Sequence, residues 1–431
     1  MQTRSTAAIT PYSLSRDHSK RLFFIITMWM ITYPFGVAVQ NMANATAFIL
    51  LTMSVVEERK TIYMRLTMLP RNLVLAWTGL ILFTLCNVIG GLLNTELNNH
   101  LSSYVSGRLA LILFPFIIYA LGGFKLFEEQ KDRFARYLIG ILGIWTLILV
   151  SQFFWSWGIR GTSIVNYGHR PEGFYSNALT LAYAYFLLFP LICVKFFERK
   201  NLFWGACFLC VTAGLVVNNS RAVILVAGLL TLLNVATVLK GKLRLAGLTV
   251  VLCSAAAILA TDNPISSRIK TFTSPSPTTT YKGYADHRFV FWDVYLDMIK
   301  EKPVFGHGPK LTTKYNEKYY DARGFEDFHK KYNAHNQFIQ IAATGGLTGL
   351  FFFLCWAVLF TVAIVRHVPD KITRLILVQT FLGFMVAGVT QNAFQDAEVR
   401  QGIFLFSMFS VVMIMAPARL GGSFTAKASS Q

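Results

Sequence analysis

Residues 337–365 read QFIQIAATGGLTGLFFFLCWAVLFTVAIV and contain no charged side chain. A membrane-spanning helix needs about 20 consecutive apolar residues, so this stretch is long enough to cross a bilayer. Its length and its small residues predict a kink at Gly345 and Gly346 or at Gly349. The stretch indicates a protein whose core lies in lipid.

The rest of the sequence has the same apolar character. It is 54% hydrophobic and only 14% charged, whereas a soluble globular domain carries about 25% charged residues. The mean hydropathy is +0.49. We therefore predict an all-α polytopic membrane protein with about twelve transmembrane helices. The predicted spans, the second of them short enough to be tilted or re-entrant, are 22–40, 44–56, 72–92, 107–123, 137–157, 177–195, 202–218, 221–239, 245–261, 337–365, 375–391 and 401–417.

The distribution of Lys and Arg predicts the orientation. Basic residues concentrate in cytoplasmic loops of membrane proteins, and long loops are exempt from this rule. With the N-terminus in the cytoplasm, most Lys and Arg of the short segments fall inside. We predict cytoplasmic termini and three parts: helices 1–9 in residues 1–261, an outer loop or lid over 262–335, and helices 10–12 with a tail in 336–431. The predicted short outer segments keep only Arg108, Arg160, Arg170, Arg221 and Arg400.

The long loop between helices 9 and 10 contains helical patterns of its own. Apolar residues from Phe289 to Ile299 recur at helical spacing, and Pro303 ends this pattern because proline disfavours helix in the residue before it. A tight turn at residues 306–309, GHGP, precedes a second amphipathic stretch over about 311–331. We expect at least two helices that lie over the outer surface of the membrane.

Three arginines on the predicted outer side are candidates for binding an anion. They are Arg170 in HRPEGFYSN, Arg221 at the outer start of a span, and Arg288 at the start of the first loop helix. An arginine within or at the edge of a membrane is costly and tends to mark a functional site. Its guanidinium fork is suited to phosphate oxygens, so a pyrophosphate is the predicted ligand. The alternative is that these side chains only reach lipid headgroups.

His335 lies where the long loop re-enters the membrane, and Asn336 follows it. A histidine can act as a general base near neutral pH, provided that a partner orients it. Asp396, in the short outer loop QNAFQDAEVR, could orient His335 or a substrate sugar. An ordinary interfacial histidine and a solvated loop acid are the alternatives.

Other kinds of chemistry find little support in the sequence. It contains neither a phosphate-binding G-x-x-x-x-G-K-[ST] loop nor a dinucleotide fingerprint, and no acidic pair on the outer side suggests a metal site. The net charge of +19 is explained by the cytoplasmic loops and does not predict nucleic-acid binding. We expect no metal and no cofactor, so the substrate itself must store the energy for the reaction, as a lipid pyrophosphate does.

Four segments together resemble the O-antigen ligase (WaaL-type) family of the O-antigen ligase/polymerase superfamily. His335-Asn336, nine residues and then Gly346-Leu347-Thr348-Gly349 are similar to its signature H-[NSQ]-x9-G-x-x-[GTY]. The other three segments are RPEGFYSNA (170–178), NSRAVIL (219–225), and the R-x3-W and P-x2-G-x-G pattern through Arg288, Trp292, Pro303, Gly306 and Gly308. The resemblance spans about residues 165–350.

The resemblance implies a metal-independent glycosyltransferase of the GT-C type in the bacterial inner membrane, with its active site facing the periplasm. It implies transfer of O-antigen from undecaprenyl pyrophosphate to lipid A–core with inversion. His335 would be the base, Arg221 and Arg288 would act on the leaving group, and the substrate-binding candidates are Arg170, Asn177, Asn336 and Asp396.

Three alternatives to this function remain open at the level of sequence. An O-antigen polymerase and a protein O-oligosaccharyltransferase share the donor and differ in the acceptor. A lipid or glycan transporter is a different class, but transporters usually show internal repeats and polar residues at the membrane midplane. The predicted spans here hold almost no charge.

Overall fold

A computed structural model describes residues 16–33, 35, 37–94, 101–155, 171, 173, 178–218, 220–261, 287–309, 312–325, 333–394 and 397–415. Within these ranges the chain forms helices and no strand. The helices are α1 (Arg16–Thr32), α2 (Val37–Glu57), α3 (Arg59–Leu66), α4 (Arg71–Leu93), α5 (Leu101–Ala120), α6 (Gly123–Trp155), α7 (Ala178–Phe186), α8 (Phe189–Arg199), α9 (Leu202–Asn218), α10 (Arg221–Val238), α11 (Gly241–Ala260), α13 (His287–Glu301), α14 (Thr312–Ala322), α15 (Gln337–His367), α16 (Lys371–Ala387), the 3-10 helix η4 (Gly388–Thr390) and α17 (Ala397–Ile414).

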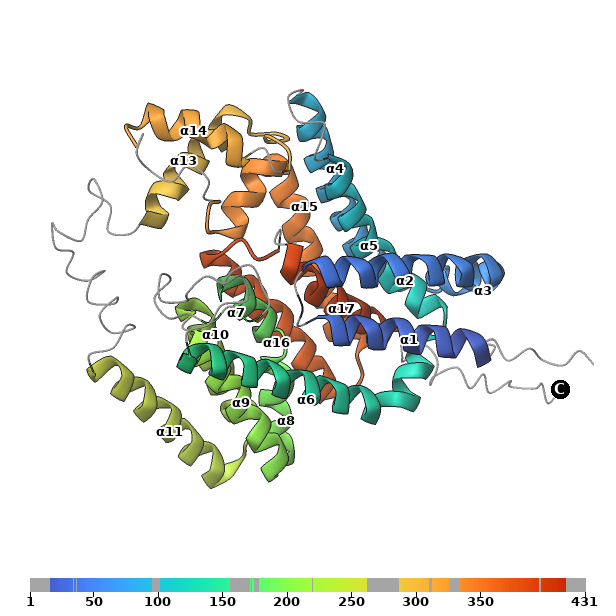
Figure 1. Ribbon diagram of the computed structural model, residues 1–431, viewed down its shortest axis with the longest axis vertical. Helices are drawn as coiled ribbons and strands as arrows, with labels where there is room; N and C mark the ends of the chain where they lie inside the picture. Colours follow the sequence, from blue (N-terminus) through green and yellow to red (C-terminus); the bar gives the residue numbers. More distant parts are fainter. Residues whose placement is uncertain are drawn as a thin grey trace, which may run out of the picture.

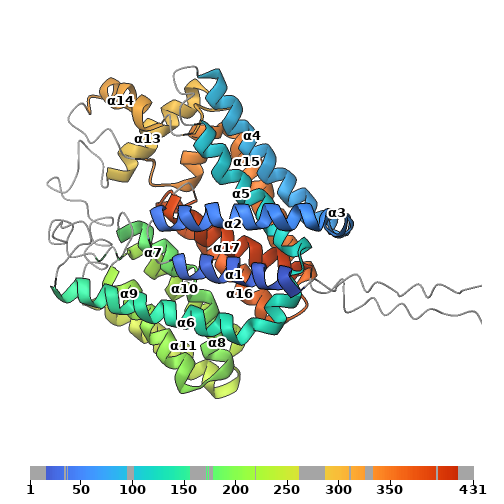
Figure 2. The same cartoon turned by 45° about the vertical axis from the view of Figure 1, so that its right-hand side comes forward.

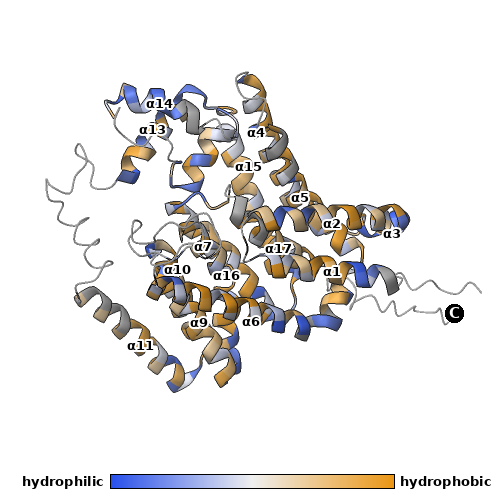
Figure 3. Ribbon diagram, viewed as in Figure 1, coloured by the Kyte–Doolittle hydropathy of each residue, from blue (hydrophilic) through white to orange (hydrophobic). Residues whose placement is uncertain are grey.

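The predicted class, an all-α polytopic membrane protein, is confirmed. In the described part of the chain, seven helices are long and apolar enough to cross a membrane, and three shorter apolar helices accompany them. Figure 3 shows apolar residues along α9, α10 and α11, whereas hydrophilic residues gather on α3, α13 and α14. Each of the twelve predicted spans overlaps at least one described helix.

Three spans differ from the prediction in their extent. The first was expected over 22–40, but α1 ends at Thr32 and α2 begins at Val37. The second was expected to be short, but α2 runs over Val37–Glu57 and is long enough to cross a membrane. The sixth was expected to be continuous, but it is divided into α7 and α8 at Leu187 and Leu188. Pro190 lies in the first turn of α8, where its missing N–H leaves no intrahelical bond unmade.

The predicted kink in the longest span is at Gly346. This residue has φ 71° and ψ 179° inside α15, a backbone conformation that interrupts the helix and that only glycine adopts readily. A Cβ atom at this position would collide with the carbonyl oxygen of Val304. The close approach shows that the kink is shaped to receive the loop that follows α13.

This loop, residues 303–309, supplies the hydrogen bonds that the kink removes from the helix. Two carbonyl groups of α15 accept bonds from the loop, and one N–H of α15 donates to it. The three backbone bonds are His307 N to Ala343 O (2.9 Å), Gly308 N to Thr344 O (2.8 Å) and Leu347 N to Pro303 O (2.7 Å). Because buried backbone groups must be paired, the loop and the kink stabilise each other. We call them together the loop–kink joint.

The predicted outer lid has a small hydrophobic core. Both views place α13 and α14 together, near the start of α15 and at the opposite edge of the molecule from α3. Their apolar side chains form a cluster separate from the core of the helical bundle. Arg323 donates hydrogen bonds to Asp297 (2.6 Å) and Asp293 (3.2 Å), which joins the end of α14 to α13. The first predicted loop helix corresponds to α13 (His287–Glu301) and is close to its predicted extent. The second, α14 (Thr312–Ala322), covers the first half of the predicted 311–331 stretch.

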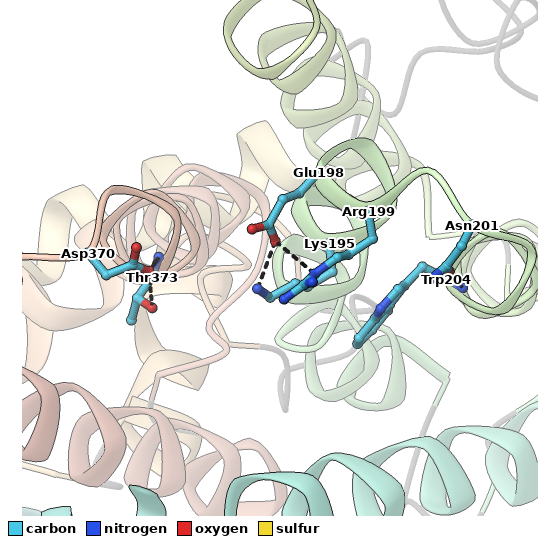
Figure 4. A network of polar contacts seen from close by, with 7 residues as sticks. All are labelled: Lys195, Glu198, Arg199, Asn201, Trp204, Asp370 and Thr373. Atoms are coloured by element: carbon cyan, nitrogen blue, oxygen red, sulfur yellow. Dashed lines mark hydrogen bonds and ion pairs between the residues drawn. The ribbon is translucent and has the colours of Figure 1, made fainter.

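Polar residues close the helix ends where α8, α9 and α16 meet (Figure 4). Lys195 pairs with Glu198 at 2.7 Å, and the side chain of Asn201 accepts a bond from the first turn of α9. Asp370 accepts a bond of 2.7 Å from the N–H of Thr373 and so caps α16. This is an end of the bundle that the sequence predicts to be cytoplasmic.

Candidate functional site

The turn that carries His335 is fixed by its own hydrogen bonds. His335 has a φ of 45°, which is uncommon for any residue other than glycine. Its N–H donates to the side-chain oxygen of Asn333 at 2.9 Å, and the N–H of Ala334 donates to the side chain of Gln340 at 2.9 Å. These bonds and the helix start at Gln337 hold the backbone in this conformation.

The imidazole of His335 is half-buried between two elements. Its Nδ1 lies 2.7 Å from Oε1 of Gln391, and its ring stacks on Phe291 of α13 with centroids 5.3 Å apart. Burial lowers the pKa of His335; the hydrogen bond to Gln391 acts in the opposite direction, and the positive charge of Arg288 lowers the pKa further. The ring is therefore neutral at neutral pH, which is the form that can accept a proton.

Arg288 brings a positive charge to the same place. It lies in the first turn of α13, is half-buried and interacts electrostatically with both His335 and Tyr183. Burial lowers the pKa of Arg288, but a guanidinium remains charged at neutral pH. The hydroxyl of Tyr183, on α7, donates to the carbonyl of Ala387 at 2.7 Å. The site is thus built where α13, α7, the start of α15 and the end of α16 converge.

Asn336 has a defined structural role at the site. It is buried, and its side-chain oxygen accepts bonds from the N–H groups of Phe338 (2.9 Å) and Ile339 (3.1 Å). This is an N-cap, which satisfies backbone donors that a helix start leaves unpaired. The side chain predicted to bind substrate thus also begins α15, and it fixes the helix directly after His335.

Arg221 is exposed at the first position of α10. In the described part of the chain it forms no hydrogen bond or ion pair, and it is not joined to His335 or Arg288. Three residues earlier, the amide of Asn218 donates to the carbonyls of Pro171 (2.9 Å) and Ala178 (2.8 Å). These bonds hold Pro171, which follows Arg170 in the sequence, beside the end of α9.

Of the three predicted catalytic residues, His335, Arg221 and Arg288, the structure therefore brings together His335 and Arg288. Arg221 begins a separate helix on which no described contact with this pair is found. The other predicted site residues lie outside the described residues, and they are Arg170, Asn177 and Asp396.

Gln391 and Tyr183 contribute to the site, but neither was among the residues predicted from the sequence. Gln391 begins QNAFQDAEVR, the short loop from which Asp396 was predicted, by its place in the topology, as a residue that could orient His335. A polar residue at the outer end of the predicted span 375–391 was a signal that could have identified it. Tyr183 lies inside an apolar span, where a single hydroxyl gives no such signal.

The site as described offers proton transfer and charge stabilisation. A neutral imidazole can take a proton from a hydroxyl group, and a half-buried guanidinium can stabilise negative charge that develops on a phosphate. No group of three His, Cys, Asp or Glu side chains that could hold a metal ion occurs among the residues that the structure describes. Independence from metal stays a prediction.

Comparison with known proteins gives a family match over part of the chain. Residues 206–354 match the family model described as O-antigen ligase. The matched segment contains Arg221, Arg288 and His335, and it supports the O-antigen ligase/polymerase superfamily, whose members are glycosyltransferases. No curated protein matches the chain.

Proposed function

We propose, from the match of residues 206–354 to the O-antigen ligase family model, that the protein moves O-antigen polysaccharide from undecaprenyl pyrophosphate to lipid A–core. The observation that carries the proposal is the position of His335 beside Arg288, a neutral base next to a half-buried cation. The two residues come from α13 and from the turn before α15, which the loop–kink joint holds together.

The reaction is a single displacement at the anomeric carbon of the donor. His335 accepts the proton of the acceptor hydroxyl while the hydroxyl oxygen forms the new bond to the anomeric carbon. The bond from that carbon to the pyrophosphate oxygen breaks, and its electron pair stays on the pyrophosphate. The products are the glycan joined to the acceptor and undecaprenyl pyrophosphate, with the configuration inverted.

Arg288 stabilises the charge that develops on the pyrophosphate as it leaves. A preorganised cation in a site with little water is effective because it needs no reorganisation during the reaction. Arg221 and Arg170 are proposed as further ligands of the phosphates, and Asn177, Asn336 and Asp396 as residues that position the sugars. No step of this proposal requires a metal ion, so transfer should survive EDTA.

The proposed location is the bacterial inner membrane, with the site facing the periplasm and both termini in the cytoplasm. The polar cluster of Figure 4, which includes Lys195, belongs to the end with many basic residues. The lipid tail of the donor would lie in the bilayer, and α13 and α14 would cover the pyrophosphate. The lid comprises residues 262–335, between the spans of 1–261 and those of 336–431.

Two other acceptors fit the same chemistry. An O-antigen polymerase would use a lipid-linked glycan, and a protein O-oligosaccharyltransferase would use a serine hydroxyl. The His-Asn-x9-Gly signature favours the ligase. A transporter is less well supported, because a base beside a cation serves a chemical step and is not required for transport.

Deletion of the gene followed by lipopolysaccharide analysis distinguishes these functions. Bare core with accumulated lipid-linked polymer is expected for a ligase, whereas core carrying one repeat unit would indicate a polymerase. Complementation with His335→Ala should fail at normal protein levels. His367→Ala is the matched control, because His367 is the last residue of α15, far along that helix from His335, which lies just before its start. Normal glycan attachment with His335→Ala would refute the proposed base.

A further inference from the structure

The contact between Gln391 and His335 determines which nitrogen of the imidazole carries the proton. Oε1 of Gln391 lies 2.7 Å from Nδ1 of His335. A carbonyl oxygen of an amide can only accept a hydrogen bond, so Nδ1 must be the donor. In a neutral imidazole the other nitrogen is then the acceptor. His335 is therefore held in the tautomer whose Nε2 is basic.

Gln391 is buried and lies in a segment that is anchored to the helical bundle. It directly follows η4 and is only 8% exposed. Further along the same segment, the N–H of Phe394 donates to the side chain of Gln337 at 3.0 Å. The ring of Phe394 packs against Phe353, with centroids 5.0 Å apart, and the guanidinium of Arg108 lies 4.4 Å from its centre. Both ends of the segment 391–394 are thus fixed to the bundle.

The surroundings of His335 explain why a neutral partner suits this site. Among the described residues, the charged group that acts on the imidazole is Arg288 of α13, while the same helix also presents Phe291 to the ring. Tyr183 of α7 interacts with Arg288, and its hydroxyl also lies 3.4 Å from Oγ1 of Thr390 in η4. A carboxylate in place of the amide would favour the imidazolium form. The amide orients the ring without adding a negative charge.

We propose that Gln391 is the positioning residue of the transfer reaction, which orients His335 so that Nε2 faces the acceptor hydroxyl and keeps the imidazole uncharged. This inference rests on the proposed function, in which His335 is the base. It also assigns the orienting role to the amide of Gln391.

Two substitutions of Gln391 test the inference through kcat and its pH dependence. Gln391→Met keeps the size of the side chain and removes the acceptor, so kcat should fall about 10- to 100-fold, a part of what general base catalysis contributes. KM should change little, because Gln391 contacts the base and not the substrate. Gln391→Glu adds a negative charge beside the imidazole, and the acidic limb of the pH profile should move up by about one pH unit or more.

The control is Gln379→Met, which removes another buried amide. Gln379 exchanges two hydrogen bonds with Asn234 between α16 and α10. This variant should lose stability but keep the wild-type pH profile. Transfer would be measured with purified full-length protein in liposomes, using a lipid-linked glycan and lipid A–core, and each variant would be checked for thermal unfolding.

Each outcome bears on one of the two proposals. A wild-type pH profile for Gln391→Glu, with His335→Ala inactive, would overturn the positioning role and leave the proposed base intact. Activity of His335→Ala would overturn the proposed base itself. If Gln391→Glu fails to fold, ¹⁵N NMR of histidine-labelled wild-type protein decides the question, with His335 assigned by comparison with His335→Gln. A protonated Nδ1 is expected, and a protonated Nε2 would refute the inference.

Discussion

Gly346→Ala should disrupt the loop–kink joint and with it the alignment of the two groups at the site. The backbone of Gly346, with φ 71° and ψ 179°, lies in a region essentially restricted to glycine, so an alanine there costs about 1–3 kcal/mol. Its Cβ would also collide with the carbonyl of Val304. The three backbone bonds of the joint are each worth about 1 kcal/mol net. If the loop separates from the helix, the strain and the collision are relieved but the three bonds are lost, at a cost of about 3 kcal/mol, and α13 with Arg288 loses its support beside His335.

Gly349→Ala provides the matched control in the same helix. A Cβ at Gly349 would meet the Cβ of Cys86 at 3.5 Å, an ordinary contact, and no unusual backbone conformation is required there. An alanine inside a helix is favoured over glycine by about 0.5–1 kcal/mol, so this variant should be as stable as the wild type or more so.

The two variants would be compared by thermal unfolding in detergent, by protease cleavage within residues 303–309 and by glycan transfer. Gly346→Ala should melt at a lower temperature, be cleaved faster and transfer less, while Gly349→Ala resembles the wild type. Equal melting, equal cleavage and equal transfer for the two variants would refute the role assigned to the joint.

Three further predictions concern the site and its lid. Because burial lowers the pKa of His335, transfer should persist as the pH falls to 6.5 and decline only below it; a decline centred above pH 7 would contradict this assignment. Arg288→Lys and Arg288→Ala should both reduce transfer, since lysine lacks the fork that binds phosphate. The residual activity of Arg288→Ala should decline at a higher pH than that of the wild type, because a charge that lowers the pKa of His335 is gone. Full transfer by both variants would exclude a role in leaving-group stabilisation. Arg323→Ala removes the bonds to Asp293 and Asp297 at a cost of about 1 kcal/mol or less, since all three side chains are partly exposed. Faster proteolysis between α13 and α14 with only a modest effect on transfer is expected. Unchanged proteolysis would argue against a role of Arg323 in joining the two helices.

Much of the fold followed from local properties of the sequence. The apolar spans predict the helices because crossing lipid requires both length and internal hydrogen bonding. The kink was predicted near Gly346, since small residues in a long helix mark the place where it can bend. The division of α7 from α8 was missed, because Leu187 and Leu188 are as apolar as their neighbours.

The candidate site was predicted less completely. His335 and Arg288 were predicted from residue type and position and are neighbours in the structure. Gln391 was missed because the choice of an orienting partner among the polar residues of one short loop depends on the direction of a side chain. Sequence spacing does not contain that direction.

The sequence by itself determined that the chain is a membrane protein, where most of its apolar helices lie, and which residue types are available for glycosyl transfer. These follow from hydropathy and from chemistry that each residue carries wherever it lies. Only the tertiary structure decided that residues 303–309 sit in the kink of α15 and that an amide contacts Nδ1 of His335. Such contacts join segments far apart in the chain, and their geometry depends on how the helices pack.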